Sequence, residues 1–173
     1  MDQWILKLIL AITVSSYVVI PVHYAAAQDH GHIVIGAGQY NVSDDETESD
    51  YRLEYRSGDA GLLFDIRPYI SGDVTSQGAH HLGAGLFKDF FLSDSVYVTP
   101  LLGIYYYQDG GSDLNLGNPV VFRSQFEFGY EFENAQRLSV GYSHYSNASL
   151  DDHNPGAEVA TLYYHHPINL YAK

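Results

Sequence analysis

The sequence has no cysteine, which excludes a disulfide framework and any zinc site built from thiolates. Basic residues are also scarce: Lys and Arg together number 8, against 21 Asp and Glu, and the formal net charge is −13. A nucleic-acid-binding protein presents a basic surface to the phosphate backbone, so this charge balance argues against DNA and RNA as partners. With 173 residues, the chain is long enough for one domain and short for two.

Long apolar runs are absent except for one near the N-terminus, which has the features of an export signal. Lys7 precedes the apolar stretch LILAITVSSYVVIPV, and YAAA follows with small residues. We predict a signal peptide at residues 1–27, cleaved after Ala27, with Ala25 at the other recognised position. An uncleaved membrane anchor is the alternative. It is disfavoured because two serines and a proline interrupt a run that is shorter than a full membrane span.

Aromatic residues, by contrast, are abundant: they make up 14% of the chain, and tyrosine alone occurs 16 times. Such a content is typical of proteins with aromatic belts at membrane interfaces. From residue 28 onward the sequence shows alternating segments separated by turn residues, without helical periodicity. The candidate strands are 32–43, 51–58, 62–71, 78–89, 96–107, 120–133, 137–147 and 158–168. Because eight is the smallest usual number for such barrels, residues 28–173 are predicted to form an all-β, eight-stranded antiparallel transmembrane β-barrel domain.

The predicted strands have one apolar face and one polar face. In VVFRSQFEFGYEFE the apolar face holds Phe122, Phe126, Phe128, Tyr130 and Phe132, and the polar face holds Arg123, Gln125, Glu127 and Glu131. YRLEYR sets Tyr51, Leu53 and Tyr55 against Arg52, Glu54 and Arg56, and LLFDIRPYI sets Leu62, Phe64, Ile66 and Ile70 against Asp65 and Arg67. A soluble lipid-binding barrel would turn the apolar face inward, whereas a membrane barrel turns it outward. Because the polar faces mix both charge signs with Gly and Ser, and lysine is nearly absent, we favour a barrel in the bacterial outer membrane.

The connections between strands agree with this topology. With the N-terminus in the periplasm, the extracellular connections are DDETESD, GDVTSQ, QDGGSDLNLGNP and ASLDDHNPGA. The intervening segments DAG, FFLSDS and NAQ are shorter on the whole, as periplasmic turns are. DDETESD is acidic like a calcium loop but lacks the Gly and the terminal Glu of such a loop. A solvated charged loop is therefore the preferred interpretation.

The segment LSVGYSHYSNAS, residues 138–149, departs from the pattern of apolar outward faces. Its even-numbered positions carry three apolar residues and then His144 and Ser146 on the same, lipid-facing side. The following strand begins EVATLYYHH and brings Glu158 to the same outer surface, at the same end. A charged group that faces lipid costs up to about a few kcal/mol. Three polar residues at one such place therefore predict a functional site.

The three side chains have the chemistry of acyl transfer. Ser146 needs a base to act as a nucleophile, and His144, two residues away on the same strand face, can be within hydrogen-bonding reach. Glu158 would bind the other ring nitrogen, fix the tautomer and stabilise the imidazolium. The alternative is that His-x-Ser is an unrelated pair at a polar barrel rim. Glu158 lies on the same outer face and at the same loop end as this pair, and the coincidence of all three residues favours the triad.

The same residues resemble those of a known family. HYSNA, residues 144–148, followed by NPGAE with Glu158, is similar to the motif of the outer-membrane lipid A 3-O-deacylases (the PagL family), and RSQFEFGYEF resembles the preceding strand. The resemblance implies an eight-stranded barrel whose outer face carries a catalytic triad of His144, Ser146 and Glu158. Such enzymes hydrolyse the ester-linked acyl chain at position 3 of lipid A in the outer leaflet, without a metal or cofactor. The resemblance also implies an oxyanion hole formed by Asn147 and the backbone amide of Ser149.

Two features depart from the family pattern. Ser149 stands where the family has Gly, so a backbone conformation that is open freely only to Gly would be costly there. The chain also ends INLYAK rather than on the aromatic residue that usually serves as the assembly signal of outer-membrane barrels, and Tyr171 would take its place.

Two histidine pairs and four glycines could also suggest binding sites. His80–His81 and His165–His166 are strand neighbours that point to opposite faces, so neither pair can chelate one ion, and we assign no metal. Gly36, Gly38, Gly83 and Gly85 lie in strands with no following helix, which indicates close packing in a narrow barrel rather than a phosphate loop. A non-catalytic structural or adhesive outer-membrane barrel is the alternative function, because acidic loops and a narrow interior would suffice for it.

Overall fold

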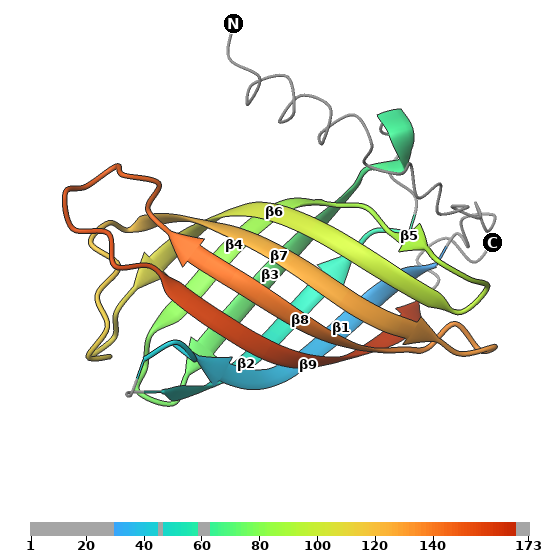
Figure 1. Cartoon of the computed structure of the whole chain (residues 1–173), viewed down its shortest axis with the longest axis horizontal. Helices are drawn as coiled ribbons and strands as arrows, with labels where there is room; N and C mark the ends of the chain where they lie inside the picture. Colours follow the sequence, from blue (N-terminus) through green and yellow to red (C-terminus); the bar gives the residue numbers. More distant parts are fainter. Residues whose placement is uncertain (1–29, 45–46, 59–62, 169–173) are drawn as a thin grey trace, which may run out of the picture.

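The computed structural model describes residues 30–44, 47–58 and 63–168 (Figure 1). The predicted signal peptide, residues 1–27, and Tyr171 lie outside these ranges. No helix within the described ranges is long and apolar enough to cross a membrane. Apart from one short 3-10 turn, η1 (Leu63–Asp65), the regular structure described is β-strand.

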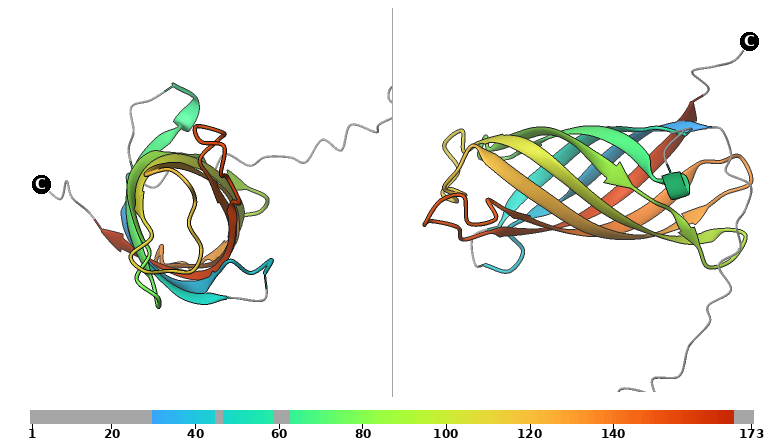
Figure 2. Two further views of the ribbon diagram at one scale, coloured as in Figure 1. Left: turned by 90° about the vertical axis from the view of Figure 1, so that its left-hand side faces the viewer. Right: turned by 90° about the horizontal axis from the view of Figure 1, so that it is seen from above.

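The strands form one antiparallel sheet that closes on itself, as the end-on view in Figure 2 shows. They are β1 (Gly31–Tyr40), β2 (Glu48–Arg56), β3 (Arg67–Thr75), β4 (His80–Phe87), β5 (Phe90–Phe91), β6 (Val96–Gln108), β7 (Val120–Glu131), β8 (Arg137–Ser146) and β9 (Ala157–Ile168). Neighbours in sequence pair with each other, except that β4 and β5 each pair with β6, and β1 also pairs with β9. The predicted antiparallel barrel is confirmed.

β4 and β5 together form one strand of the barrel. The pairing of β4 with β6 ends at Phe87 opposite Leu101, and β5 resumes at Phe90 opposite Val98 in the same register. Pro100 lies opposite the gap and has no N–H with which to return a hydrogen bond, which explains the interruption. With β4 and β5 counted as one strand the barrel has eight, and an even number returns both ends to the same side.

Alternate residues of each strand place apolar side chains on the outer wall. In β7 the predicted faces are confirmed: Phe126 is 74% exposed and Phe128 54%, whereas Arg123 and Glu127 are buried. Other exposed apolar side chains are Ile35, Tyr51, Leu53, Ile70, Leu82, Leu102, Ile104, Val140, Tyr142 and Leu162. An apolar surface of this extent around a closed barrel is that of a membrane protein, and it excludes the soluble lipid-binding barrel.

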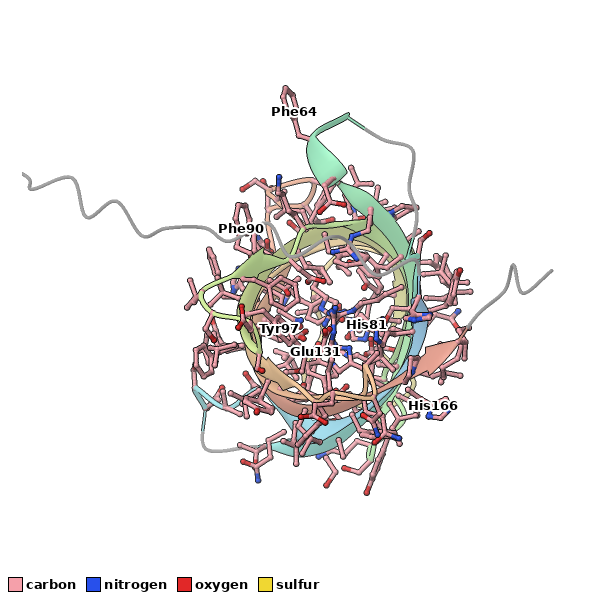
Figure 3. All side chains as sticks on the ribbon, turned by 90° about the vertical axis from the view of Figure 1, so that its right-hand side faces the viewer. Phe64, His81, Phe90, Tyr97, Glu131 and His166 are labelled. Carbon is pink, nitrogen blue, oxygen red and sulfur yellow. The ribbon has the colours of Figure 1, made fainter. Side chains whose placement is uncertain are left out.

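Polar side chains fill the interior as a network of ion pairs. These pairs join Arg123 to Glu54, Arg56 to Glu127, Arg52 to Asp50, and both Arg67 and Arg137 to Asp89. Each of these charged groups is almost fully buried, and burial of a charge is tolerated only when it is paired and hydrogen-bonded. In Figure 3, His81 and Tyr97 lie inside the barrel, whereas Phe64, Phe90 and His166 lie outside it. The described interior is thus occupied by side chains, and eight strands enclose a space about wide enough for side chains to fill.

The third predicted strand, residues 62–71, was misplaced. The observed β3 covers Arg67–Thr75, and the residues just before it form η1, in which Phe64 has φ of +63°. A left-handed residue cannot continue an extended strand, so the apolar alternation there does not form one. As a consequence, the β2–β3 connection covers residues 57–66 rather than the short DAG turn, and the β3–β4 connection is only residues 76–79.

The long connections next to β8 lie at one end of the barrel. The β6–β7 loop (residues 109–119) and the β8–β9 loop (residues 147–156) lie at the left of Figure 1. The β5–β6 and β7–β8 turns (residues 92–95 and 132–136) lie at the opposite end. Because outer-membrane barrels have long extracellular loops and short periplasmic turns, the end with the two long loops is the extracellular end.

Candidate active site on the outer wall of the barrel

The three predicted catalytic residues lie close together on the outer wall, at the extracellular end of β8 and β9. β8 lies between β7 and β9, and the register sets Ser124, His144 and Glu158 in one row. The side chain of His144 is 46% exposed and that of Glu158 is 30% exposed. Ser146 occupies the next outward position of β8 and stands opposite Phe122 of β7. The register thus brings the three predicted residues to one site.

His144 and Glu158 form a hydrogen-bonded pair. The distance between His144 Nδ1 and Glu158 Oε1 is 3.0 Å. A carboxylate accepts hydrogen bonds, so Nδ1 carries the proton and Nε2 is left with its lone pair. This is the tautomer that a general base needs, and the carboxylate is placed to stabilise the imidazolium that forms when Nε2 accepts a proton.

Gly156 provides room for the His144 ring. It has φ of +74°, and a Cβ atom there would lie 2.9 Å from His144 Cε1 and 3.6 Å from Nε2. Gly156 directly precedes Ala157, whose pair with Tyr145 is the last of the β8–β9 register. The Cε1–Nε2 edge of the His144 ring therefore faces the backbone of Gly156.

The hydroxyl of Ser146 forms no hydrogen bond with any residue in the described part of the chain. The serine–histidine hydrogen bond of a triad is thus not formed in this structure, although the histidine–carboxylate bond is. Hydrogen bonds between catalytic groups are often long without substrate and shorten when substrate binds. The hydroxyl is available both to the ring of His144 and to a substrate.

Tyr145 fixes β8 from the inside, between the two candidate catalytic residues. Its side chain is fully buried and its hydroxyl donates a hydrogen bond to Asp73 Oδ2 at 3.1 Å. Its ring centroid lies 4.5 Å from that of His81. Because the inner face of β8 is packed in this way, the neighbouring outward side chains are held on a rigid support, which a precise catalytic geometry requires.

Asn147 follows the last residue of β8 and has a buried side chain. Its Nδ2 donates hydrogen bonds to the Leu116 carbonyl at 2.9 Å and the His153 carbonyl at 2.8 Å, and its backbone N–H donates to Asn154 Oδ1 at 2.9 Å. The side chain thus joins the β6–β7 and β8–β9 loops beside Ser146. For this side chain to serve an oxyanion, one of its two hydrogen bonds would have to open, so its oxyanion role stays a prediction.

Ala148 and Ser149 form the tight turn that follows. Their φ values are +51° and +63°, and the Leu150 N–H donates a hydrogen bond to the Asn147 carbonyl at 3.0 Å. Two central residues with positive φ are typical of a type I′ turn, in which Gly and Asn are preferred. Ser149 therefore has the left-handed backbone that a glycine would adopt without strain.

An apolar groove of about 350 Å³ lies on the outer wall next to the site. Its side chains come from β6, β7 and β8: Val98, Phe126, Phe128, Val140 and Tyr142. Tyr142 is the next outward residue of β8 after His144 on the periplasmic side. An alkyl chain in this groove would contact apolar surface while its polar end reached His144 and Ser146.

Comparison with known proteins identifies the family. The family model for lipid A 3-O-deacylase (PagL) matches residues 67–167, more than half of the chain. The chain belongs to the lipid A 3-O-deacylase (PagL) family. A curated relative, the lipid A deacylase PagL of Pseudomonas aeruginosa, is 35% identical over 104 residues, which are 58% of this chain and 60% of that protein. The chain therefore matches about three fifths of the length of this PagL relative.

Solved structures agree on the fold. The crystal structure of the outer membrane enzyme PagL matches with a TM-score of 0.62 and 24% identity, over 79% of this chain and 99% of that one. Neisserial surface protein A matches with a TM-score of 0.51 and 13% identity, over 79% and 94% of the two chains. Likenesses at this identity show the fold, which is that of an outer-membrane β-barrel.

Two contributions to the site were not predicted from the sequence. Gly156 had no assigned role, although NPG two residues before Glu158 could have suggested a residue with positive φ. The contact of the two loops through Asn147 also could not be foreseen, because it depends on where Leu116 and His153 lie in space. The histidine pairs are oriented as predicted, with His81 and His165 buried. Among the described residues no cluster of His, Asp and Glu could hold a metal ion.

Proposed function

We propose that this protein is a lipid A 3-O-deacylase that hydrolyses the ester-linked acyl chain at position 3 of lipid A through Ser146, His144 and Glu158. The observation that carries the proposal is the hydrogen-bonded His144–Glu158 pair on an outer wall that otherwise faces lipid. Membership of the PagL family supports the reaction, and the name of the Pseudomonas aeruginosa relative supports lipid A as the substrate.

The chemistry follows from the tautomer of His144. Nε2 takes the proton from the Ser146 hydroxyl as Oγ attacks the ester carbonyl carbon, while Glu158 stabilises the imidazolium. The tetrahedral intermediate collapses, the bond to the sugar oxygen breaks, and that oxygen receives the proton from Nε2. A water molecule, deprotonated in turn by Nε2, then hydrolyses the acyl-serine and releases a free fatty acid. The partly exposed site at the extracellular end of the barrel gives this water access.

The oxyanion of each tetrahedral intermediate needs donors near Ser146. We assign this role to Asn147 and to the backbone amide of Ser149, which follow the nucleophile in the tight turn after β8. For Asn147 this assignment requires one of its loop hydrogen bonds to exchange for one to the oxyanion, because both of its amide hydrogens are used. Backbone and amide donors of this kind typically contribute about 10²–10³-fold in turnover each.

The substrate would approach sideways from the outer leaflet. The groove lined by Phe126, Phe128 and Val140 would hold an acyl chain parallel to the strands, with the ester at the level of Ser146. The apolar wall and the polar catalytic residues match the amphipathic character of an acylated sugar. The filled barrel interior takes no part in this reaction.

The decisive test compares lipid A from cells that express the wild type, Ser146→Ala or Ser49→Ala. Ser49 is a suitable control because it is an exposed residue at the extracellular end of β2, three strands from β8. Mass spectrometry should show loss of one ester-linked acyl chain with the wild type and the control, and intact lipid A with Ser146→Ala. Heat-modifiable gel migration checks that each barrel is folded. Intact lipid A with the folded wild type would favour the non-catalytic barrel instead.

A further inference from the structure

The connections at the extracellular end offer no Lys or Arg side chain to bind phosphate. The extracellular connections, residues 41–47, 76–79, 109–119 and 147–156, contain no Lys or Arg. They contain the carboxylates Asp44, Asp45, Glu46, Asp109, Asp113, Asp151 and Asp152. Arg and Lys are the charged side chains that attract phosphate groups. A phosphorylated headgroup would therefore meet acidic loops rather than a basic site.

The described Arg and Lys residues lie elsewhere. The side chains of Arg52, Arg56, Arg67, Arg123 and Arg137 are buried inside the barrel and paired with carboxylates. Lys88 lies in the gap between β4 and β5, toward the periplasmic end, and donates a hydrogen bond to the Phe64 carbonyl. None of these cations can reach a headgroup at the extracellular rim.

A polar pocket of about 450 Å³ lies at that rim, between the end of β6 and the β6–β7 loop. We call it the rim pocket, and its side chains with hydrogen-bonding groups include Tyr106, Gln108, Asp109, Asn115 and Asn118. Amide, carboxylate and phenol groups without a cation are the donors and acceptors that suit sugar hydroxyls, since a hydroxyl both donates and accepts.

Some of this hydrogen-bonding capacity is unused. Gln108 Nε2 donates to the Tyr106 hydroxyl oxygen at 3.1 Å, which leaves the Tyr106 proton to donate elsewhere. The side chain of Asn118 accepts from the Val120 N–H at 2.8 Å, and its Nδ2 has no partner in the described ranges. Asp109 uses Oδ2 for Asn115 Nδ2 at 3.1 Å, so Oδ1 can accept from a ligand. The tyrosine is also 53% exposed, so its ring is available to an apolar sugar face.

The rim pocket is within reach of the catalytic serine. Ser146 pairs with Phe122, which pairs with Ile104, and Tyr106 is the next outward residue beyond Ile104 toward the extracellular end. Tyr106 lies two strand spacings across the sheet and two residues along a strand from Ser146, a distance of about 12 Å along the wall. This is about the length of a disaccharide.

We propose that the rim pocket binds the uncharged hydroxyl groups of the sugar part of the substrate, and that phosphate groups contribute nothing to its recognition by the protein. This inference rests on the proposed function, because the acyl ester must lie at Ser146 while the sugar reaches Tyr106. It adds a specificity: removal of the phosphates from the glycolipid does not weaken its binding, because the extracellular connections contain no Lys or Arg to attract them.

The test is a binding experiment with soluble probes on the full-length barrel. The protein is held in a deuterated zwitterionic detergent without sugar groups, with chelator present so that divalent cations cannot bridge phosphates to carboxylates. The probes are a β-1,6-linked glucosamine disaccharide, its bisphosphorylated form and inorganic phosphate, and saturation-transfer NMR measures their binding. We expect the neutral disaccharide to bind in the millimolar range, the bisphosphate no more tightly, and phosphate not at all.

Variants locate the site. Tyr106→Leu and Asn118→Ala should each weaken disaccharide binding at least fivefold. Tyr51→Leu is the matched control and should leave it unchanged, because Tyr51 is an outward tyrosine of β2 with a similar exposure of 57%. Tenfold tighter binding of the bisphosphate, or unchanged binding in Tyr106→Leu, would overturn the proposal.

The same experiment separates this inference from the proposed function. The Ser146→Ala variant should bind the disaccharide as the wild type does, because the rim pocket is intact in it. A barrel that removes an acyl chain from lipid A but gives no disaccharide signal would overturn the sugar site alone. A barrel that binds the disaccharide and leaves lipid A intact would overturn the deacylase activity alone.

Discussion

Replacing Glu158 by Gln removes one negative charge while keeping the size of the side chain and one acceptor. The distance from His144 Nδ1 to Glu158 Oε1 is 3.0 Å, and the two side chains are 46% and 30% exposed. A charge pair at such a distance is worth about 1 kcal/mol in water and about 4 kcal/mol near a protein surface. The partial exposure puts this pair between these values, at about 1.5–3 kcal/mol.

The charge acts mainly on the imidazolium of the transition state, so the loss should appear in turnover. Each 1.4 kcal/mol corresponds to about a tenfold change in rate, which predicts a loss of about 10–100-fold for Glu158→Gln. Loss of Ser146 or His144 should be far larger, up to about a millionfold, and the double variant should lose no more than either single variant.

The assay follows release of fatty acid from purified lipid A in mixed micelles, with the barrel fold of each variant checked by heat-modifiable gel migration. Wild-type turnover in Glu158→Gln would show that the hydrogen bond to His144 is structural only. A loss as large as that of Ser146→Ala would show that the carboxylate does more than orient the ring and stabilise its charge. Either result would refute the division of roles within the triad.

Three further substitutions test the surroundings of the triad. Ser149→Gly should stabilise the barrel by about 0.5–1 kcal/mol, because φ of +63° is strained for serine, and an unchanged urea midpoint would count against this. Gly156→Ala should lower turnover about 10–100-fold with little change in KM. The new Cβ would lie 2.9 Å from His144 Cε1 and would displace the ring. Normal kinetics in this variant would mean that the ring does not lie against Gly156. Asn147→Ala should lower turnover about a hundredfold, which is the usual effect of removing one oxyanion donor. It should also speed proteolysis of the loops at Leu116 and His153, because it removes the hydrogen bonds to their carbonyls. Unchanged cleavage would argue against the loop contact.

The fold could largely be predicted, because the alternation of apolar and polar residues along a strand assigns each side chain to one of the two faces of the sheet. The alternation predicted for residues 120–133 assigned the side chains of β7, residues 120–131, to the wall or the interior, and the structure agrees within that strand. The third strand failed for a local reason: the apolar alternation at Leu62–Ile66 looked like a strand, but the positive φ of Phe64 is not encoded by any glycine there. Alternation indicates the face of a side chain, not where a strand begins.

The sequence predicted on which face and at which end of the barrel the site lies, but not the contacts within it. His144, Ser146 and Glu158 could be assigned to one outer surface from parity alone, and the register then set His144 opposite Glu158. Contacts between loops follow no periodicity, so the hydrogen bonds of Asn147 to Leu116 and His153 required the structure. Distances between side-chain atoms depend on rotamers, which strand patterns do not determine.

The buried ion pairs of the interior have a consequence for how the barrel enters the membrane. While the seam between β1 and β9, the first and last strands, is open, Arg56 and Arg123 would lack Glu127 and Glu54, their partners across the barrel. A lipid-exposed arginine at the bilayer midplane costs about 2–4 kcal/mol, so two of them would disfavour an open sheet by about 4–8 kcal/mol. Ring closure and insertion must therefore occur together, and a partly inserted, unclosed sheet has no stable place on the assembly pathway.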